Sequence, residues 1–218
     1  MIKAYVFDVY GTLFDVHSVI HKCNQFFPHK GSKISHTWRE KQLEYSYLRQ
    51  LMGNYTSFST VTKDALRYAV HKHGEQLDPQ TEKELFHAYF HLDPYPEVKE
   101  VLSQLQHKKL AVFSNGSHDM LDPLIAQSEL HHLFDEIISV DEIQQFKPTL
   151  ASYEHARKCL NVKPEEVLFM SSNGWDITGA KNYGFQTAWI NRHHLPVEEL
   201  NLEPHTIYSN LSGILEWE

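Results

Sequence analysis

The chain has 218 residues, 41% of them hydrophobic and 22% charged, which is typical of a soluble globular protein with one domain and an insertion, or two small domains. Its 20 Lys and Arg against 28 Asp and Glu give a net charge of −8, which argues against nucleic-acid or anionic-membrane binding, since both need a basic face. Cys23 and Cys159 fit no CxxC pattern. With no signal-peptide pattern and no apolar stretch of membrane-spanning length, we expect free thiols and a cytoplasmic protein.

Short apolar runs that end at turns predict the strands of a parallel sheet. The first run, residues 4–9, stops at Tyr10-Gly11-Thr12. Similar runs occupy residues 109–115, 135–140, 166–172, 186–190 and 205–209. Segments of helical period separate them, so the pattern predicts an α/β fold with a doubly wound, Rossmann-like parallel sheet. Such sheets bind ligands beyond the carboxyl ends of their strands.

Residues 15–94 interrupt this alternation with three or four consecutive helical patterns and no convincing strand. The clearest pattern begins near Ser35, a plausible helix cap, and stops at Gly53. We therefore expect an α/β core domain of residues 1–14 and 95–218. An all-helical cap domain, residues 15–94, is expected to cover the edge of the sheet where a ligand would bind.

Polar side chains stand where successive predicted strands end. They comprise two carboxylates, a lysine, hydroxyls and amides, namely Asp8, Thr12, Ser114, Asn115, Lys147, Ser171, Asn173 and Asp176. Any one of them alone reads as a helix cap or a turn residue. Together at successive strand ends they indicate one crevice, in which a buried carboxylate beside a lysine is an activated anion whose charge is countered.

Four motifs resemble the haloacid dehalogenase superfamily, in order through nearly the whole chain. They are FDVYGTLFD from residue 7, SNG from residue 114, Lys147-Pro148, and SSNGWDITGAKNYG from residue 171. Phosphatases of that superfamily carry Asp where this chain has Tyr10, and a phenol with a pKa of about 10 is poorly suited to the carboxylate's proton transfers. Tyr10, WREKQLEYSYLR from residue 38 and WINR from residue 189 are similar to the type II L-2-haloacid dehalogenases, which work without metal.

The resemblance implies a hydrolase with no cofactor and no metal, acting on a small 2-haloacid. Asp8 would attack C2, expel halide and form an aspartyl ester. Water would then attack the ester carbonyl, so that an (S)-2-haloacid gives an (R)-2-hydroxyacid. Asp176 would be the general base.

The remaining catalytic residues support these two carboxylates. Ser171 and Asn173 would place the water together with Asp176. Lys147 would counter the charges of Asp8 and Asp176, and Thr12 would orient Asp8.

A second group of residues is assigned to substrate binding. The Ser114 hydroxyl and backbone N–H groups would hold the substrate carboxylate, and Arg39 with Asn115 would receive the halide. Leu43 and Phe58 could equally be core side chains, and Arg39 could equally pair with a surface Glu. The assigned residues are Tyr10, Arg39, Leu43, Phe58, Ser114, Asn115, Tyr153 and Trp175, with Tyr153 also fixing the catalytic network by hydrogen bonding.

Two other functions stay open at this point. One is a magnesium-dependent phosphatase that uses the same Asp8 nucleophile, against which Tyr10 argues. The other is a non-catalytic relative that binds a small carboxylate or a protein, against which the intact Asp8, Lys147 and Asp176 argue.

Further features of the sequence bear on metal, partner and pocket. The 16 histidines complete no ligand set with Cys or acidic residues, so we interpret them as surface side chains. The aromatic and apolar stripe in residues 45–51 would pack on the core or on a second copy. Relatives commonly dimerise, which leaves a homodimer open. Gly174, where Ala is commoner, and residues 149–152 depart from the family pattern and could reshape the pocket.

Overall fold

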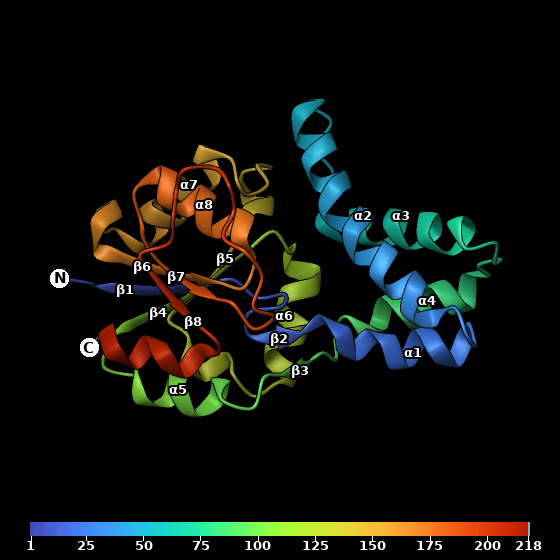
Figure 1. The fold of residues 1–218 in the computed structure, drawn as a ribbon, viewed down its shortest axis with the longest axis horizontal. Helices are drawn as coiled ribbons and strands as arrows, with labels where there is room; N and C mark the ends of the chain where they lie inside the picture. Colours follow the sequence, from blue (N-terminus) through green and yellow to red (C-terminus); the bar gives the residue numbers. More distant parts are fainter. Residues whose placement is uncertain (218) are drawn as a thin grey trace. The chain divides into compact units, whose positions relative to one another are not determined.

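Six parallel strands form the main sheet of the computed structural model, which describes residues 1–217 (Figure 1). Across the sheet they run in the order β5 (Glu136–Ser139), β4 (Lys109–Ser114), β1 (Ala4–Phe7), β6 (Val167–Ser171), β7 (Gln186–Ile190) and β8 (Thr206–Tyr208). Because β1 pairs with β4 on one side and β6 on the other, its four residues are all buried. The expected doubly wound α/β sheet is confirmed.

The chain forms two compact units. The sheet unit contains Met1–Asp15, Pro94–Asn115 and the chain from Glu129 onward. The helical unit contains Val16–Asp93 and Gly116–Ser128.

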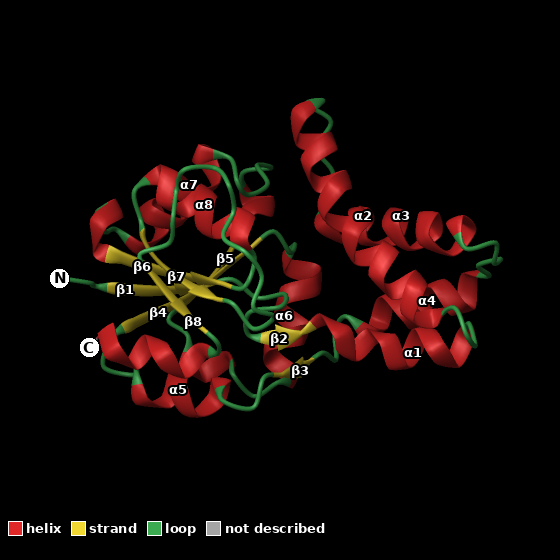
Figure 2. Ribbon diagram, in the orientation of Figure 1, coloured by secondary structure: helices red, strands yellow, loops and turns green. Residues whose placement is uncertain are grey.

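Helices flank the main sheet in the sheet unit, as Figure 2 shows in red against the yellow strands. They are α5 (Val98–Gln104), α7 (Leu150–Leu160), α8 (Gly174–Tyr183) and the 3₁₀ segment η5 (Leu211–Trp217). Three further 3₁₀ turns precede strands or helices in this unit, η2 (His131–Leu133), η3 (Val140–Glu142) and η4 (Pro164–Glu166). Apolar residues fill the strands between the helices, so the sheet is covered on both faces, as all-parallel sheets require.

The helical unit is built from α1 (Val19–Phe26), α2 (Gly31–Leu51), α3 (Phe58–Lys72), α4 (Pro79–Ala88) and α6 (His118–Gln127). Its core contains Trp38, whose ring lies edge-on to Tyr89 with centroids 4.9 Å apart. Ser57 caps α3 by accepting from the Thr60 N–H, and Asp78 caps α4 in the same way. These caps mark where the helical patterns begin.

The structure departs from the sequence-based expectations in three places. Ser35 is not a cap, because α2 already begins at Gly31, where the close approach of the α1 backbone leaves no space for a Cβ. Residues 116–128, expected in the core domain, group with the helical unit. Two strands of two residues each, β2 (Phe14–Asp15) and β3 (Asp93–Pro94), form a small second sheet. The division into a core and a cap domain stays a prediction.

No helix in the part of the chain that the structure describes is long and apolar enough to cross a membrane.

Gly179 permits a close approach between α8 and α7 that a larger residue would prevent. A Cβ at Gly179 would lie 2.6 Å from Cβ of Pro148 and would collide with the hydroxyl of Tyr153. We expect Gly179→Ala to lower the free energy of unfolding by about 1–3 kcal/mol, the usual cost of overpacking, as measured by urea denaturation.

Gly174→Ala is the matched control, since its Cβ would meet only the exposed side chain of Glu198, which is free to move. We expect Gly174→Ala to change the free energy of unfolding by no more than about 0.5 kcal/mol. Equal destabilisation by both substitutions would contradict the importance of the contact at Gly179.

Candidate active site

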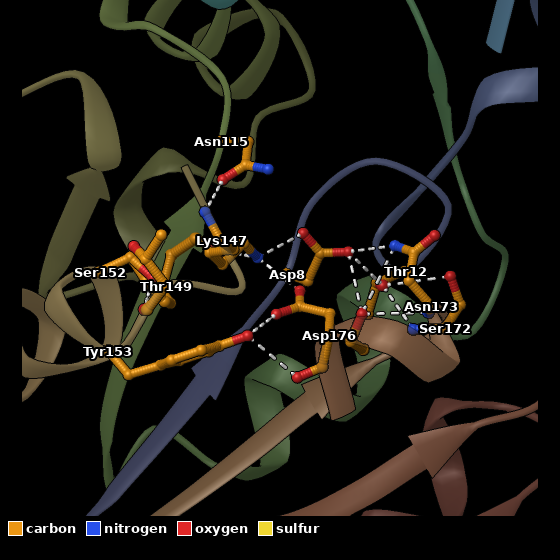
Figure 3. A network of polar contacts seen from close by, with 12 residues as sticks. Asp8, Thr12, Asn115, Lys147, Thr149, Ser152, Tyr153, Ser172, Asn173 and Asp176 are labelled. Atoms are coloured by element: carbon orange, nitrogen blue, oxygen red, sulfur yellow. Dashed lines mark hydrogen bonds and ion pairs between the residues drawn. The ribbon is translucent and has the colours of Figure 1, made fainter. Parts of the chain in front are cut away.

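The carboxyl ends of β1, β4 and β6 bring the predicted polar residues to one edge of the sheet. Asp8 directly follows β1, Asn115 follows β4, and Ser171 ends β6. The register aligns Phe7 with Val112 and Met170, so the residues after these strands lie side by side. The parallel order of the strands is therefore what assembles the cluster in Figure 3.

Asp8 is a buried carboxylate whose two oxygens have different partners. Its Oδ2 accepts from Thr12 Oγ1 at 3.0 Å, Ser171 Oγ at 3.1 Å and Asn173 Nδ2 at 2.9 Å. Its Oδ1 accepts from Lys147 Nζ at 3.0 Å. These four hydrogen bonds hold the Asp8 carboxylate in one orientation.

Lys147 connects the two carboxylates of the site (Figure 3). Its ammonium lies 3.0 Å from Asp8 Oδ1 and 2.6 Å from Asp176 Oδ2, and donates to the carbonyl of Phe113 at 3.1 Å. Burial alone lowers the pKa of Lys147, but the charges of Asp176 and Asp8 outweigh it and raise that pKa above its ordinary value. The lysine is therefore a fixed cation between the two carboxylates.

Asp176 stands in the first turn of α8 and is fully buried. Tyr153 of α7 donates its hydroxyl to Asp176 Oδ1 at 2.8 Å, while Lys147 binds the other oxygen. Burial raises the pKa of Asp176 to about 6, with the negative charge of Asp8 adding to the rise and Lys147 opposing it. A carboxyl with this pKa is poised to exchange a proton near neutral pH.

Tyr153, predicted both to bind substrate and to fix the network, is fully buried with its hydroxyl bound to Asp176. That position suits the network role.

Backbone and side-chain contacts hold the loop that follows Asp8. Thr12 Oγ1 accepts from the backbone N–H of Ser172 at 2.8 Å, which ties this loop to the end of β6. Arg192 donates to the carbonyl of Thr12 at 2.9 Å and pairs with Glu97 at 2.7 Å. No local sequence pattern indicates these roles of Ser172 and Arg192, because their partners are more than 90 residues away along the chain.

The other predicted substrate residues of the sheet unit lie around the same strand ends. Asn115 accepts from the backbone N–H of Lys147 at 2.8 Å, so its amide positions the lysine's loop. Ser114 is buried at the end of β4, and Tyr10 is buried in the turn after Asp8. Trp175, in the first turn of α8, is partly exposed.

Arg39, Leu43 and Phe58 belong to the helical unit. Phe58 is 1% exposed at the start of α3, whereas Arg39 and Leu43 are half-buried on α2. Arg39 Nη1 donates to Gln42 Oε1 at 3.1 Å, so its partner is an amide and not the surface Glu considered above.

Gln42 is the buried residue that positions Arg39. Its Nε2 donates to Thr62 Oγ1 at 2.8 Å, and its Oε1 also accepts from the hydroxyl of Tyr89 at 3.4 Å. Sequence reasoning passed over Gln42, although a Gln on the buried face of an amphipathic helix is a signal that could have found it.

The arrangement joins two carboxyl groups through one lysine. Asp8 presents its carboxyl group at the edge of the sheet, and Asp176 presents a second carboxyl group with a raised pKa. Lys147 between them removes most of their mutual repulsion. Such a pair suits formation of a covalent ester on one carboxylate and its hydrolysis with help from the other.

Comparison with known proteins agrees with this geometry. Residues 2–184 match the model of a family described as haloacid dehalogenase-like hydrolases. An (S)-2-haloacid dehalogenase from Pseudomonas putida is 42% identical over 218 residues, covering 99% of this chain and 96% of the relative. Haloacetate dehalogenase H-2 from Moraxella sp. strain B is 40% identical over 205 residues, covering 93% and 92% respectively.

A solved structure is similar over the same length. L-2-haloacid dehalogenase from Xanthobacter autotrophicus with chloropropionic acid covalently bound has a TM-score of 0.92 and 40% identity, covering 99% of this chain and 97% of that one. Since the family model spans most of the chain and the relatives align along almost all of it, this chain belongs to the haloacid dehalogenase-like hydrolases.

Proposed function

We propose that the chain acts as an (S)-2-haloacid dehalogenase, hydrolysing the carbon–halogen bond of short L-2-haloalkanoic acids without a metal. The observation that carries this proposal is the buried Lys147 ammonium bound to both Asp8 and Asp176. The similar enzyme with chloropropionic acid covalently bound supports an intermediate attached to the protein. In this chain Asp8 is the carboxylate best placed to form it.

In the first step the Asp8 carboxylate attacks C2 of the substrate from the side opposite the halogen. A carbon–oxygen bond forms as the carbon–halogen bond breaks, and the halide leaves with the electron pair. Thr12, Ser171 and Asn173 hold the attacking group in one orientation through their bonds to Oδ2, which lowers the entropic cost of the displacement.

In the second step water attacks the carbonyl carbon of the Asp8 ester. Asp176 accepts a proton from this water. The bond between the ester carbonyl carbon and the oxygen on C2 then breaks, and the departing alkoxide takes up that proton to leave as the hydroxyacid, with C2 inverted. Lys147 and the neutral donors around Asp8 stabilise the negative charge that develops on the ester oxygen. Attack on the Asp8 carbonyl regenerates the free carboxylate.

Substrate contacts follow the predicted assignments. The Ser114 hydroxyl and the backbone N–H groups beside Asp8 and Asn115 hold the substrate carboxylate. Tyr10 and Trp175 contribute apolar surface. The assignments of Leu43 and Phe58 to the apolar wall and of Arg39 to the halide stay predictions from the sequence, because these three residues belong to the helical unit. Short-range donors of this kind let a protein of net charge −8 bind an anion.

The homodimer and the cytoplasmic location stay predictions. Leu48, Leu51 and Met52, at the C-terminal end of α2, are 42%, 83% and 66% exposed. They are the apolar surface that a second copy would cover.

The direct test is halide release from racemic 2-chloropropionate in the presence of EDTA, with chiral analysis of the residual acid and the product. We expect only the (S) enantiomer to be consumed and only (R)-lactate to form, because displacement inverts C2 once. In the same assay Asp8→Asn, which keeps the shape of the side chain but not its nucleophilic charge, should release no halide.

Circular dichroism of Asp8→Asn serves as the folding control. Wild-type halide release by that variant would overturn the assignment of the nucleophile. An inert wild-type chain that instead hydrolyses phosphate esters when magnesium is added would overturn the dehalogenase proposal.

The pKa of Asp176 predicts the acid limb of the pH profile. The base must be ionised to hydrolyse the Asp8 ester, so kcat, measured where ester hydrolysis limits turnover, should fall as the pH drops through about 6 or slightly below, because esterification removes the Asp8 charge that helps to raise this pKa. Tyr153→Phe removes a hydrogen bond that lowers the pKa of Asp176, so the limb should move to higher pH.

Tyr183→Phe is the matched control, because its hydroxyl donates to Glu154 and not to Asp176. The profile of that variant should stay where the wild-type profile lies. A Tyr153→Phe profile that coincides with the wild type would count against Asp176 as the base.

Arg39→Ala tests the halide acceptor. Loss of a preorganised donor for developing charge typically lowers kcat about 100- to 1,000-fold, so we expect a loss of that order in chloride release. Arg49→Ala on the same helix, which removes an ion pair with Asp64, should leave kcat unchanged. Equal kcat values for chloride release by the two variants would contradict the assignment of Arg39 as the halide acceptor.

A further inference from the structure

Three side chains of the sheet unit that play no part in the proposed reaction gather their metal-ligating atoms in one place. They are Glu142, His155 and Cys159, and these atoms all lie within 4.8 Å of one another, contrary to the sequence-based interpretation that the histidines complete no ligand set with Cys or acidic residues. His155 and Cys159 are one helical turn apart on α7 and therefore share a face. Glu142 ends η3, which precedes α7 in the chain.

The separations suit one ion between the three groups. Zinc bonds of about 2.0–2.3 Å at tetrahedral angles put neighbouring ligand atoms about 3.3–3.8 Å apart. His155 Nε2 lies 3.3 Å from Glu142 Oε2 and 3.8 Å from Cys159 Sγ. The ligand atoms of Glu142 and Cys159 need to close by at most about 1.5 Å, because they lie within 4.8 Å of one another.

The chemistry of the donors selects the kind of ion. A thiolate, an imidazole nitrogen and a carboxylate together suit zinc, whereas magnesium and calcium take oxygen ligands. The second oxygen of Glu142 lies 3.5 Å from the backbone N–H of Ser139 in a capping box, so the carboxylate is already oriented.

We propose that Glu142, His155 and Cys159 form a zinc-class binding site, with water as the fourth ligand. Binding exchanges the thiol proton for the metal: the S–H bond breaks, a metal–sulfur bond forms and the proton goes to solvent. Partial burial raises the pKa of Cys159, and the charges of Glu142 and Glu136 add to this, so the metal competes with the thiol proton for the sulfur.

The ion would join η3 to α7 across the segment that carries Lys147. Residues 143–149 run between these two elements, and Tyr153 lies on α7 itself. Metal binding therefore stabilises the part of the chain that carries Lys147 and Tyr153, the two residues bound to Asp176. None of the three metal ligands belongs to the proposed catalytic set.

The test is a titration of the whole metal-free chain with cobalt(II), followed by displacement with zinc. We expect a sulfur-to-cobalt charge-transfer band in the near ultraviolet that zinc removes, and a rise in Tm on adding zinc. Cys159→Ser should abolish the band. Removing a residue that only hydrogen-bonds to a metal ligand typically weakens metal binding about 10- to 100-fold. Because His155 is proposed as a ligand itself, His155→Ala should weaken cobalt binding by more than that.

His36→Ala is the matched control, because His36 lies 3.2 Å from Glu40 on α2 in a similar His–Glu pair. It should leave cobalt binding unchanged. Absence of the sulfur band in the wild type, or the same band in Cys159→Ser, would overturn the proposal.

A second measurement is independent of cobalt. Zinc should slow alkylation of the exposed Cys159 by iodoacetamide in the wild type but not in His155→Ala, while Cys23 is buried in both. Unprotected Cys159 at saturating zinc would also overturn the site. Chloride release in EDTA reports on the dehalogenase proposal separately, so the two can fail independently.

Discussion

The buried ion pairs of Lys147 with Asp8 and Asp176 are the interaction on which the site depends. All three groups lie out of water, with side-chain exposures of 1%, 7% and 0%. Removing one partner of such a cluster typically costs about 3–5 kcal/mol, since it leaves a buried charge uncompensated. Each of these three charges would be unfavourable to bury alone, and they are stable at the edge of the sheet because they are buried together. The groups proposed to carry out the reaction therefore also stabilise this edge of the sheet.

A different part of the fold positions each residue of this cluster. The register of β1 with β4 and β6 determines where Asp8 and Ser171 lie. The segment between η3 and α7 brings Lys147, which is anchored by the bond from its backbone N–H to Asn115. The close packing of α8 on α7 at Gly179 leaves the space in which Tyr153 reaches Asp176. A change in the strand register, in the segment that carries Lys147 or in the packing at Gly179 would therefore move the carboxylates or their partners.

The two units solve the same problem of holding a charged side chain by different means. In the sheet unit, opposite charges and backbone carbonyls hold Lys147. In the helical unit, a neutral network of Gln42, Thr62 and Tyr89 holds Arg39 and leaves its positive charge without an acidic partner in that network. A guanidinium held by amides and hydroxyls keeps its capacity to bind an anion, which agrees with the role proposed for Arg39.

The sequence by itself determined the strand–helix alternation, the helical segment after the first strand, and the identities of Asp8, Lys147 and Asp176. Local periodicity and turn residues encode these features, and the motifs are long enough to identify the family. Only the tertiary structure decided which atoms meet, such as the three donors on Asp8 Oδ2, the tie from Ser172 to Thr12 and the burial of Gln42. Those contacts join residues up to 165 positions apart, and strand order and packing set them, neither of which a local pattern contains.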